Sequence, residues 1–97
     1  MTEVSEAKED LLTLRDEIDK IDSELVRLFK DRFVVSEKIA NYKMTVGKPI
    51  YDPEREKVKI DSVSSFGEDE FEKEALSELF TKIMELSRKK QQQIKEV

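Results

Sequence analysis

The sequence predicts an all-α fold of three helices, one long, one short and one of medium length, that forms a helical homodimer. Two observations predict the helices. Glycine and proline occur only twice each, and they fall between residues 47 and 53 and at Gly67. Such sparse chain breakers favour a few long helices over strands and turns. Between the breaks, apolar residues recur at steps of three and four, which is the spacing of one helix face.

The breaks set the bounds of the three elements. The expected helices cover about residues 8–45, 53–65 and 69–94. Asp52 and Pro53 mark the start of the second helix, because aspartate is a favoured N-cap and proline is favoured at the first helical position. We expect residues 1–9 to be a flexible polar tail and residues 10–95 to be the helical domain.

The first expected helix carries an apolar seam. Its members are Leu11, Leu14, Ile18, Ile21, Leu25, Leu28, Arg32, Val35, Ile39 and Tyr42. Their alternating steps of three and four keep one stripe facing a packed neighbour along the whole helix. A helix of about 38 residues is about 57 Å long, which exceeds the diameter of a compact domain of this size. The two shorter helices cannot cover that stripe, and a second copy of the chain is therefore expected to do so.

The composition excludes several classes of function. The 97 residues make one small domain with a thin core. A net charge of −5 is not the basic surface of a nucleic-acid-binding protein. Without cysteine or histidine the chain has no disulfide, thiolate nucleophile, histidine base or histidine metal ligand, and we expect neither metal nor cofactor. No stretch approaches the roughly 18 apolar residues of a membrane span, and no signal peptide is recognisable, so a cytoplasmic protein is expected.

Polar residues interrupt both apolar stripes. Arg32 occupies a seam position, and burial of an unpaired guanidinium is costly, so it must meet an anion. The inward stripe of the third helix consists of Leu76, Phe80, Ile83, Ser87, Gln91 and Ile94. Ser87 and Gln91 are neighbours on that stripe and need hydrogen-bond partners. Lys43 lies close to three turns after Arg32, about 16 Å along the helix and on nearly the same side.

Each of these residues also has an ordinary structural explanation. Arg32 can form a structural ion pair, Ser87 and Gln91 can fix the register of two helices, and Lys43 can be a solvated lysine near a helix end. Together they supply donors suited to carboxylates and to an ether or carbonyl oxygen. A pocket between helices is a usual place for a ligand. The joint pattern therefore predicts a site for a small organic dianion.

The position of Arg15 bears on whether two chains share this site. It precedes Arg32 by 17 residues, which is about 25 Å along the same helix. A small metabolite cannot touch both arginines of one chain. If both bind the ligand, Arg15 must reach the site of the partner subunit.

Five stretches resemble, in order and at the expected spacing, the all-helical chorismate mutase family. They are residues 14–19, 28–32, 39–43, 49–56 and 83–91. The resemblance covers about residues 10–92 and fails only around the connector at Phe66 and Gly67. It implies three helices per chain in an intertwined homodimer. It also implies the conversion of chorismate to prephenate, a unimolecular [3,3] rearrangement on the route to phenylalanine and tyrosine.

The resemblance implies a role for each polar residue of the two stripes. Arg32 and the partner's Arg15 would clamp the two carboxylates of chorismate. Lys43 and Gln91 would donate hydrogen bonds to the ether oxygen, on which negative charge builds up. Ser87 would touch a carboxylate.

The resemblance also gives roles to the first turn of the second helix. Asp52 and Glu56 there are explained by the sequence alone as an N-cap and as an acid favoured by the helix dipole. In the family, Glu56 would hold the ring hydroxyl of chorismate together with the Asp52 backbone. Arg55 would stand behind these groups as a supporting charge.

Two other functions compete with the mutase. An isochorismate pyruvate-lyase uses the same scaffold, but lyases that resemble this family tend to depart near the positions of Glu56 and Ser87, and both are present here. A non-catalytic helical dimerisation or regulatory module would explain the seam of the first helix. It would not explain why Ser87 and Gln91 face inward.

Overall fold

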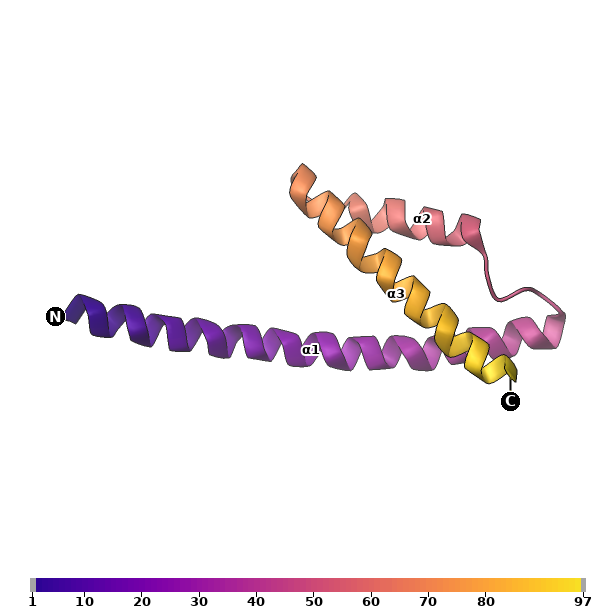
Figure 1. The fold of residues 1–97 in the computed structure, drawn as a ribbon, viewed down its shortest axis with the longest axis horizontal. Coiled ribbons are helices and arrows are strands. Elements are labelled where there is room, and N and C mark those ends of the chain that lie inside the picture. Colours follow the sequence, from indigo (N-terminus) through magenta and orange to yellow (C-terminus); the bar gives the residue numbers. More distant parts are fainter. Residues whose placement is uncertain (1, 97) are drawn as a thin grey trace. The chain divides into compact units, whose positions relative to one another are not determined.

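The computed structural model describes residues 2–96, and the side chains of residues 10–94, as three α-helices without a strand (Figure 1). They are α1 (Thr2–Val46), α2 (Pro53–Ser64) and α3 (Glu70–Glu96). The predicted all-α class is confirmed. The expected start of the first helix near residue 8 is wrong, because α1 already begins at Thr2. Residues 2–9 contain no glycine or proline that would stop a helix, and several are good helix formers.

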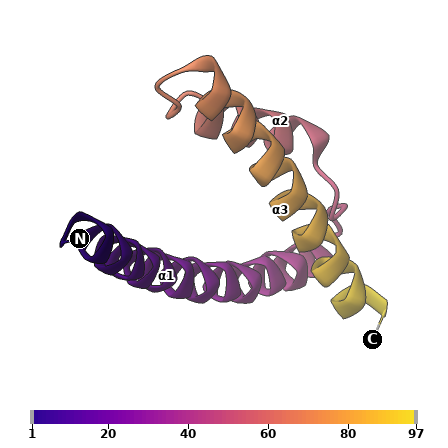
Figure 2. The ribbon, with the colours of Figure 1, turned by 60° about the vertical axis from the view of Figure 1, so that its left-hand side comes forward.

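The chain divides into two compact units, Met1–Arg32 and Phe33–Val97. The second unit contains the end of α1 together with α2 and α3, and α2 packs against α3 (Figure 2). Its core is small: the buried apolar residues are Ala40, Ile50 and Met84. Among residues 2–96, no helix combines the length and the apolar character that a bilayer span requires. A flexible tail over residues 1–9 stays a prediction.

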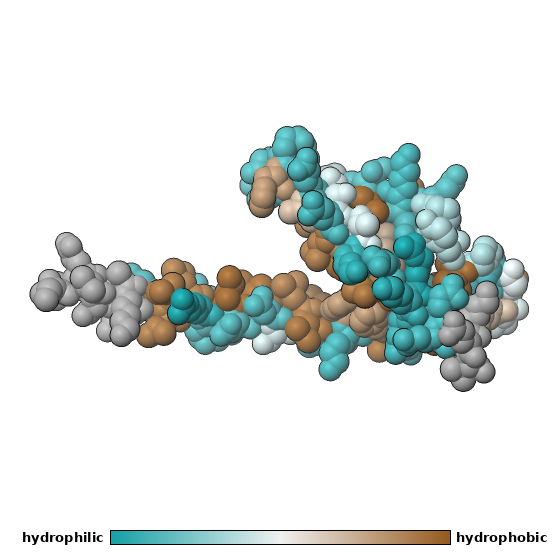
Figure 3. All heavy atoms as spheres, in the orientation of Figure 1, coloured by the Kyte–Doolittle hydropathy of each residue, from teal (hydrophilic) through white to brown (hydrophobic). Residues whose placement is uncertain are grey.

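The apolar seam of the first unit is exposed. Leu14 is 59% exposed, and Ile18 and Leu25 are each 57% exposed. Figure 3 shows hydrophobic side chains following one another along α1. Charged pairs such as Lys20–Asp16, 3.2 Å apart, occupy other positions of the same helix. The predicted stripe is therefore present, and the predicted second copy that would cover it stays a prediction.

A Schellman motif ends α1 at Gly47. The Lys48 N–H donates to the Lys43 carbonyl at 2.8 Å, and the Gly47 N–H donates to the Met44 carbonyl at 3.4 Å. Gly47 has a φ of +75°, a left-handed conformation that glycine adopts without strain. The chain then turns back, so that Ile50 is buried and its carbonyl meets the side chain of Lys43.

Short-range hydrogen bonds fix the starts of α2 and α3, and a buried glycine shapes the turn between these two helices. Asp52 is the predicted N-cap of α2, and its Oδ1 accepts from the Arg55 N–H at 3.0 Å. Gly67 is buried in the turn after α2, where a Cβ would lie 2.6 Å from the Lys73 nitrogen. Only glycine fits such a close backbone approach. Asp69 Oδ1 then accepts from the Glu72 N–H at 2.8 Å, at the start of α3.

Candidate active site

The inward stripe of α3 is confirmed. Ser87 and Gln91 are each 7% exposed, and the other stripe members are half-buried: Leu76, Phe80, Ile83 and Ile94. The Gln91 Nε2 donates to the carbonyl oxygen of Ser36 on α1 at 3.1 Å. An amide nitrogen carries two hydrogens, so this bond occupies only one of its donors. Gln91 thus makes the interhelical contact that a register-fixing residue would make, and this contact alone does not use up its donor capacity.

Lys43 lies near the end of α1 and is not a solvated lysine. Its side chain is half-buried, and its Nζ donates to the Ile50 carbonyl at 3.0 Å. The turn at Gly47 creates this contact by folding the chain back onto the helix. An ammonium group has three donors. The hydrogen bond to Ile50 uses one of these donors and orients the group, and this geometry is compatible with a further acceptor such as an anionic or ether oxygen.

The first turn of α2 carries Asp52, Arg55 and Glu56. The Asp52 side chain is exposed and serves as the N-cap. Glu56 is half-buried, and its Oε1 and Oε2 accept from the Nη1 of Arg88 at 3.1 and 3.2 Å. Arg55 is exposed and makes no ion pair within residues 10–94. The cation that pairs with Glu56 in the structure is therefore Arg88, and the supporting role of Arg55 stays a prediction.

Sequence reasoning missed Arg88. It follows Ser87 directly but lies off the inward stripe, where a lysine or arginine is expected to be solvated. Its guanidinium carbon lies 4.5 Å from the centre of the Tyr51 ring, in a cation–π contact. In a lysine-rich segment of α3, only the contacts with α2 and Tyr51 distinguish Arg88 from its neighbours.

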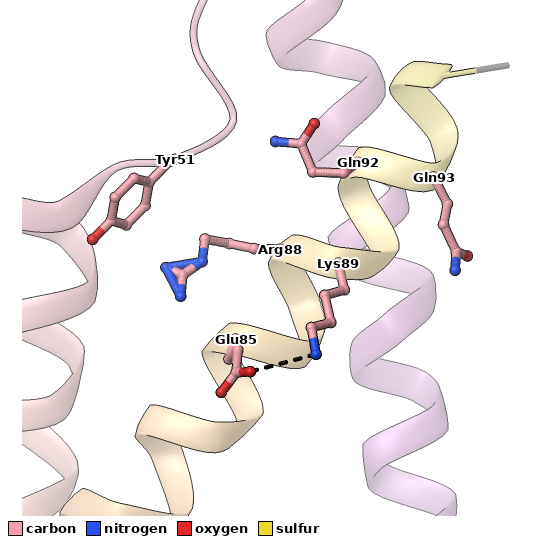
Figure 4. Close-up of a pocket in the computed structure, with 6 residues that line it drawn as sticks. All are labelled: Tyr51, Glu85, Arg88, Lys89, Gln92 and Gln93. Carbon is pink, nitrogen blue, oxygen red and sulfur yellow. Dashed lines mark ion pairs between the residues drawn. The ribbon is translucent and has the colours of Figure 1, made fainter.

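A shallow hollow of about 700 Å³ lies beside Arg88. It is lined by Tyr51, Glu85, Arg88, Lys89, Gln92 and Gln93 (Figure 4). Lys89 pairs with Glu85 at 3.4 Å within α3, and the hydrogen bond and charge of Lys82, followed by those of Lys89, lower the pKa of Glu85. None of the predicted site residues lines this hollow. At 100° per residue its α3 members face away from Ser87 and Gln91, so the hollow is not the predicted site.

The predicted residues fall into both units. Arg15 is exposed and Arg32 is half-buried in the unit Met1–Arg32. The remaining predicted residues belong to the unit Phe33–Val97: Lys43, Asp52, Arg55, Glu56, Ser87 and Gln91. Within this second unit an ammonium, a hydroxyl, an amide and a carboxylate are held by α1, α2 and α3. These groups can bind a small polar molecule through hydrogen bonds and charge, without a nucleophile or a histidine base.

Comparison of the sequence with known protein families shows which family the chain belongs to. A family model described as chorismate mutase type II matches residues 14–92. The chain belongs to this family. The matched range begins just before Arg15 and ends just after Gln91, so that it contains every predicted site residue. The resemblance expected from the sequence is confirmed.

Curated relatives of this chorismate mutase family member come from bacteria and an archaeon. A bifunctional chorismate mutase/prephenate dehydratase of Aquifex aeolicus is 32% identical over 80 residues, which is 78% of this chain and 22% of that protein. A chorismate mutase of Methanocaldococcus jannaschii is 38% identical over 55 residues, which is 57% of this chain and 56% of that protein. The chain thus spans a minor part of the bifunctional relative and about half of the archaeal one.

Solved structures share the three-helix fold. Form II of the chorismate mutase from Thermus thermophilus has a TM-score of 0.80 at 27% identity, over 84% of this chain and 93% of that one. Form I of the same protein has a TM-score of 0.75 at 28% identity, over 79% of this chain and 96% of that one. The likeness covers nearly all of the Thermus chain in both forms.

Proposed function

We propose that the chain is a chorismate mutase that converts chorismate to prephenate in the cytoplasm, in the biosynthesis of phenylalanine and tyrosine. The observation that carries this proposal is the pair Ser87 and Gln91, each 7% exposed on an otherwise apolar stripe, together with the half-buried Lys43. Membership of the chorismate mutase type II family supports the choice of substrate. The reaction uses no metal and no cofactor.

The chemistry suits a site made of hydrogen-bond donors. In the rearrangement a carbon–oxygen bond breaks while a carbon–carbon bond forms within one molecule, and no proton is transferred. The site must hold the reactive diaxial conformer and stabilise the negative charge that builds up on the ether oxygen. Lys43 Nζ and Gln91 Nε2 donate to that oxygen. Removal of one such donor typically costs about 2.7–4 kcal/mol of transition-state stabilisation.

The substrate's carboxylates and hydroxyl require separate groups. Arg32 and the partner's Arg15 bind the two carboxylates, since arginine pairs with carboxylates through two parallel hydrogen bonds. Ser87 contributes a further contact to a carboxylate. Glu56 accepts a hydrogen bond from the ring hydroxyl, with help from the Asp52 backbone.

An intertwined homodimer completes the site. The seam of α1 leaves large apolar side chains such as Leu14, Ile18 and Leu25 more than half exposed in the single chain. Their burial against a second copy contributes roughly 25 cal/mol per Å² of apolar surface. The exposed Arg15 lies next to Leu14 on this helix, from which it reaches the site of the partner subunit.

Chorismate turnover tests the proposal. Purified protein is mixed with chorismate, the loss of ultraviolet absorbance is followed, and the product is identified by chromatography. Prephenate formation that depends on protein concentration is expected, and Lys43→Ala is expected to abolish it. Absence of turnover would favour a non-catalytic helical module. In a parallel assay with isochorismate as the substrate, release of pyruvate would indicate a lyase.

A further inference from the structure

We infer that Arg88 is a positioning residue, which holds the Glu56 carboxylate in the orientation that receives the ring hydroxyl of chorismate. This inference rests on the proposed function, because the role of Glu56 belongs to it. It concerns a residue outside the predicted set, placed on α3 next to Ser87.

The ion pair between Arg88 and Glu56 ties the first turn of α2 to α3. One nitrogen, Arg88 Nη1, donates to both carboxylate oxygens of Glu56, at 3.1 and 3.2 Å. The side chains are 30% and 22% exposed. A pair such as Lys20–Asp16 is 77% and 66% exposed and joins residues four apart on one helix. Water and salt screen the Arg88 pair less, so it can hold a geometry that a surface pair cannot.

Arg88 is itself held in place by Tyr51. The guanidinium lies over the Tyr51 ring at 4.5 Å, and a flat guanidinium stacks well on an aromatic face. Tyr51 directly precedes the N-cap Asp52, whose carbonyl accepts from the Glu56 N–H at 3.1 Å. The backbone and the side chain of Glu56 are thus both fixed relative to the start of α2. A glutamate without such partners would sample several rotamers and lose conformational entropy on binding a ligand.

The contact leaves Glu56 able to bind substrate. Each carboxylate oxygen has two acceptor positions, and Arg88 occupies one on each. The positive charge of Arg88 also offsets the repulsion between the Glu56 carboxylate and a dianionic ligand. Without Arg88, the carboxylate would be both less ordered and less tolerant of the substrate's charge.

Arg88 acts through Glu56 and does not touch the substrate itself. Its side chain points toward Tyr51 and lines the hollow beside Lys89 (Figure 4). The inward stripe of α3, with Ser87 and Gln91, faces a different direction. Arg88 therefore holds the hydroxyl-binding carboxylate from the side away from the substrate, which is the role that the family resemblance implied for Arg55.

A double-mutant cycle tests this inference, with kcat and KM for chorismate measured on the wild type, Arg88→Met, Glu56→Gln and the double variant. Arg88→Met is expected to lower kcat/KM about tenfold, equal to about 1.4 kcal/mol. The double variant is expected to match Glu56→Gln alone, because no carboxylate remains for Arg88 to orient. Arg88→Lys keeps the charge and is expected to recover part of the loss. Lys89→Met removes the same charge from a residue that pairs with Glu85 on the same helix, and it is expected to retain wild-type kcat/KM.

Three results would overturn the inference. Wild-type kcat/KM in Arg88→Met shows that Arg88 does not position Glu56. If the two fold-losses of kcat/KM multiply in the double variant, Arg88 acts on the fold and not through Glu56. If the wild type does not convert chorismate, the proposed function fails, and this inference fails with it. Circular dichroism is recorded for each variant to check that it folds. If Arg88→Met does not fold, Arg88→Lys replaces it in the cycle, and the smaller loss of kcat/KM in Arg88→Lys must then disappear when Glu56→Gln is also present.

Discussion

Replacement of Gln91 by leucine should separate catalysis from stability. In the structure Gln91 donates a hydrogen bond from Nε2 to the Ser36 carbonyl at 3.1 Å. A neutral hydrogen bond of this kind contributes about 0.5–1.5 kcal/mol net to stability. Ser36 lies inside α1, so its carbonyl keeps the backbone N–H partner of the helix. Removal of the amide therefore leaves no unsatisfied buried group.

The leucine itself partly compensates for the lost hydrogen bond. It has a volume close to that of glutamine and joins a stripe with half-buried apolar members such as Ile83 and Ile94. Each newly buried methylene contributes about 0.8 kcal/mol. The free energy of unfolding should thus change by less than about 1 kcal/mol. The loss of a donor to the ether oxygen, by contrast, should lower kcat by roughly 100-fold or more.

Urea denaturation and the rate of chorismate consumption measure the two effects on the same protein samples. Gln92→Leu is the matched control, because Gln92 is the next residue on α3 and its side chain is exposed. It should leave kcat unchanged. A Gln91→Leu protein that loses several kcal/mol of stability, yet keeps kcat within about threefold, would show that Gln91 only fixes the register of α1 and α3.

Three further predictions concern the basic residues. Lys43→Ala should keep its helical circular dichroism, and its free energy of unfolding should fall by about 1 kcal/mol because the hydrogen bond to the Ile50 carbonyl is lost. It should retain less than about a tenth of the wild-type rate. A higher rate would show that Lys43 is not a donor to the ether oxygen. Arg32→Leu should abolish turnover and raise the melting temperature, since replacement of a buried charge by a packed apolar group is often stabilising; a marked loss of dimer stability would assign Arg32 to a structural ion pair. Arg15→Ala and Arg32→Ala should each be inactive alone, whereas joint refolding at equal amounts should return about a quarter of wild-type activity through heterodimers with one intact site. A mixture that stays inactive, although mass spectrometry shows exchange, would mean that Arg15 does not act across the dimer.

The helices and the inward stripe of α3 could be predicted because both depend on local rules. The bounds of α2 follow from the cap Asp52 and from the lack of breakers before Gly67. Once α3 is a helix, its spacing alone puts Ser87 and Gln91 on the face of Phe80 and Ile83. The start of α1 was predicted less accurately than the other helix ends, because residues 2–9 carry no strong start signal.

The contacts of the site could not be predicted because they depend on how the helices pack. Glu56 and Arg88 are 32 residues apart, and their pairing requires the crossing geometry of α2 and α3. The family resemblance implied Arg55 as the supporting charge, and nothing in the sequence pattern indicated Arg88. The burial of Lys43 likewise depends on the turn at Gly47, which brings a backbone carbonyl to its ammonium group. Residue spacing along one helix contains no information on either contact.

Proton NMR of the reaction in D₂O tests the central claim most directly, that the chain accelerates a unimolecular rearrangement of chorismate by positioning and charge alone. The purified protein is incubated with chorismate, and spectra are recorded at early conversion. Prephenate should be the only product, and it should carry no deuterium on carbon beyond the slow exchange of the methylene next to its keto group, which prephenate alone in D₂O measures, because the step transfers no proton. Unchanged chorismate, free pyruvate or deuterium at any other product carbon would contradict the claim.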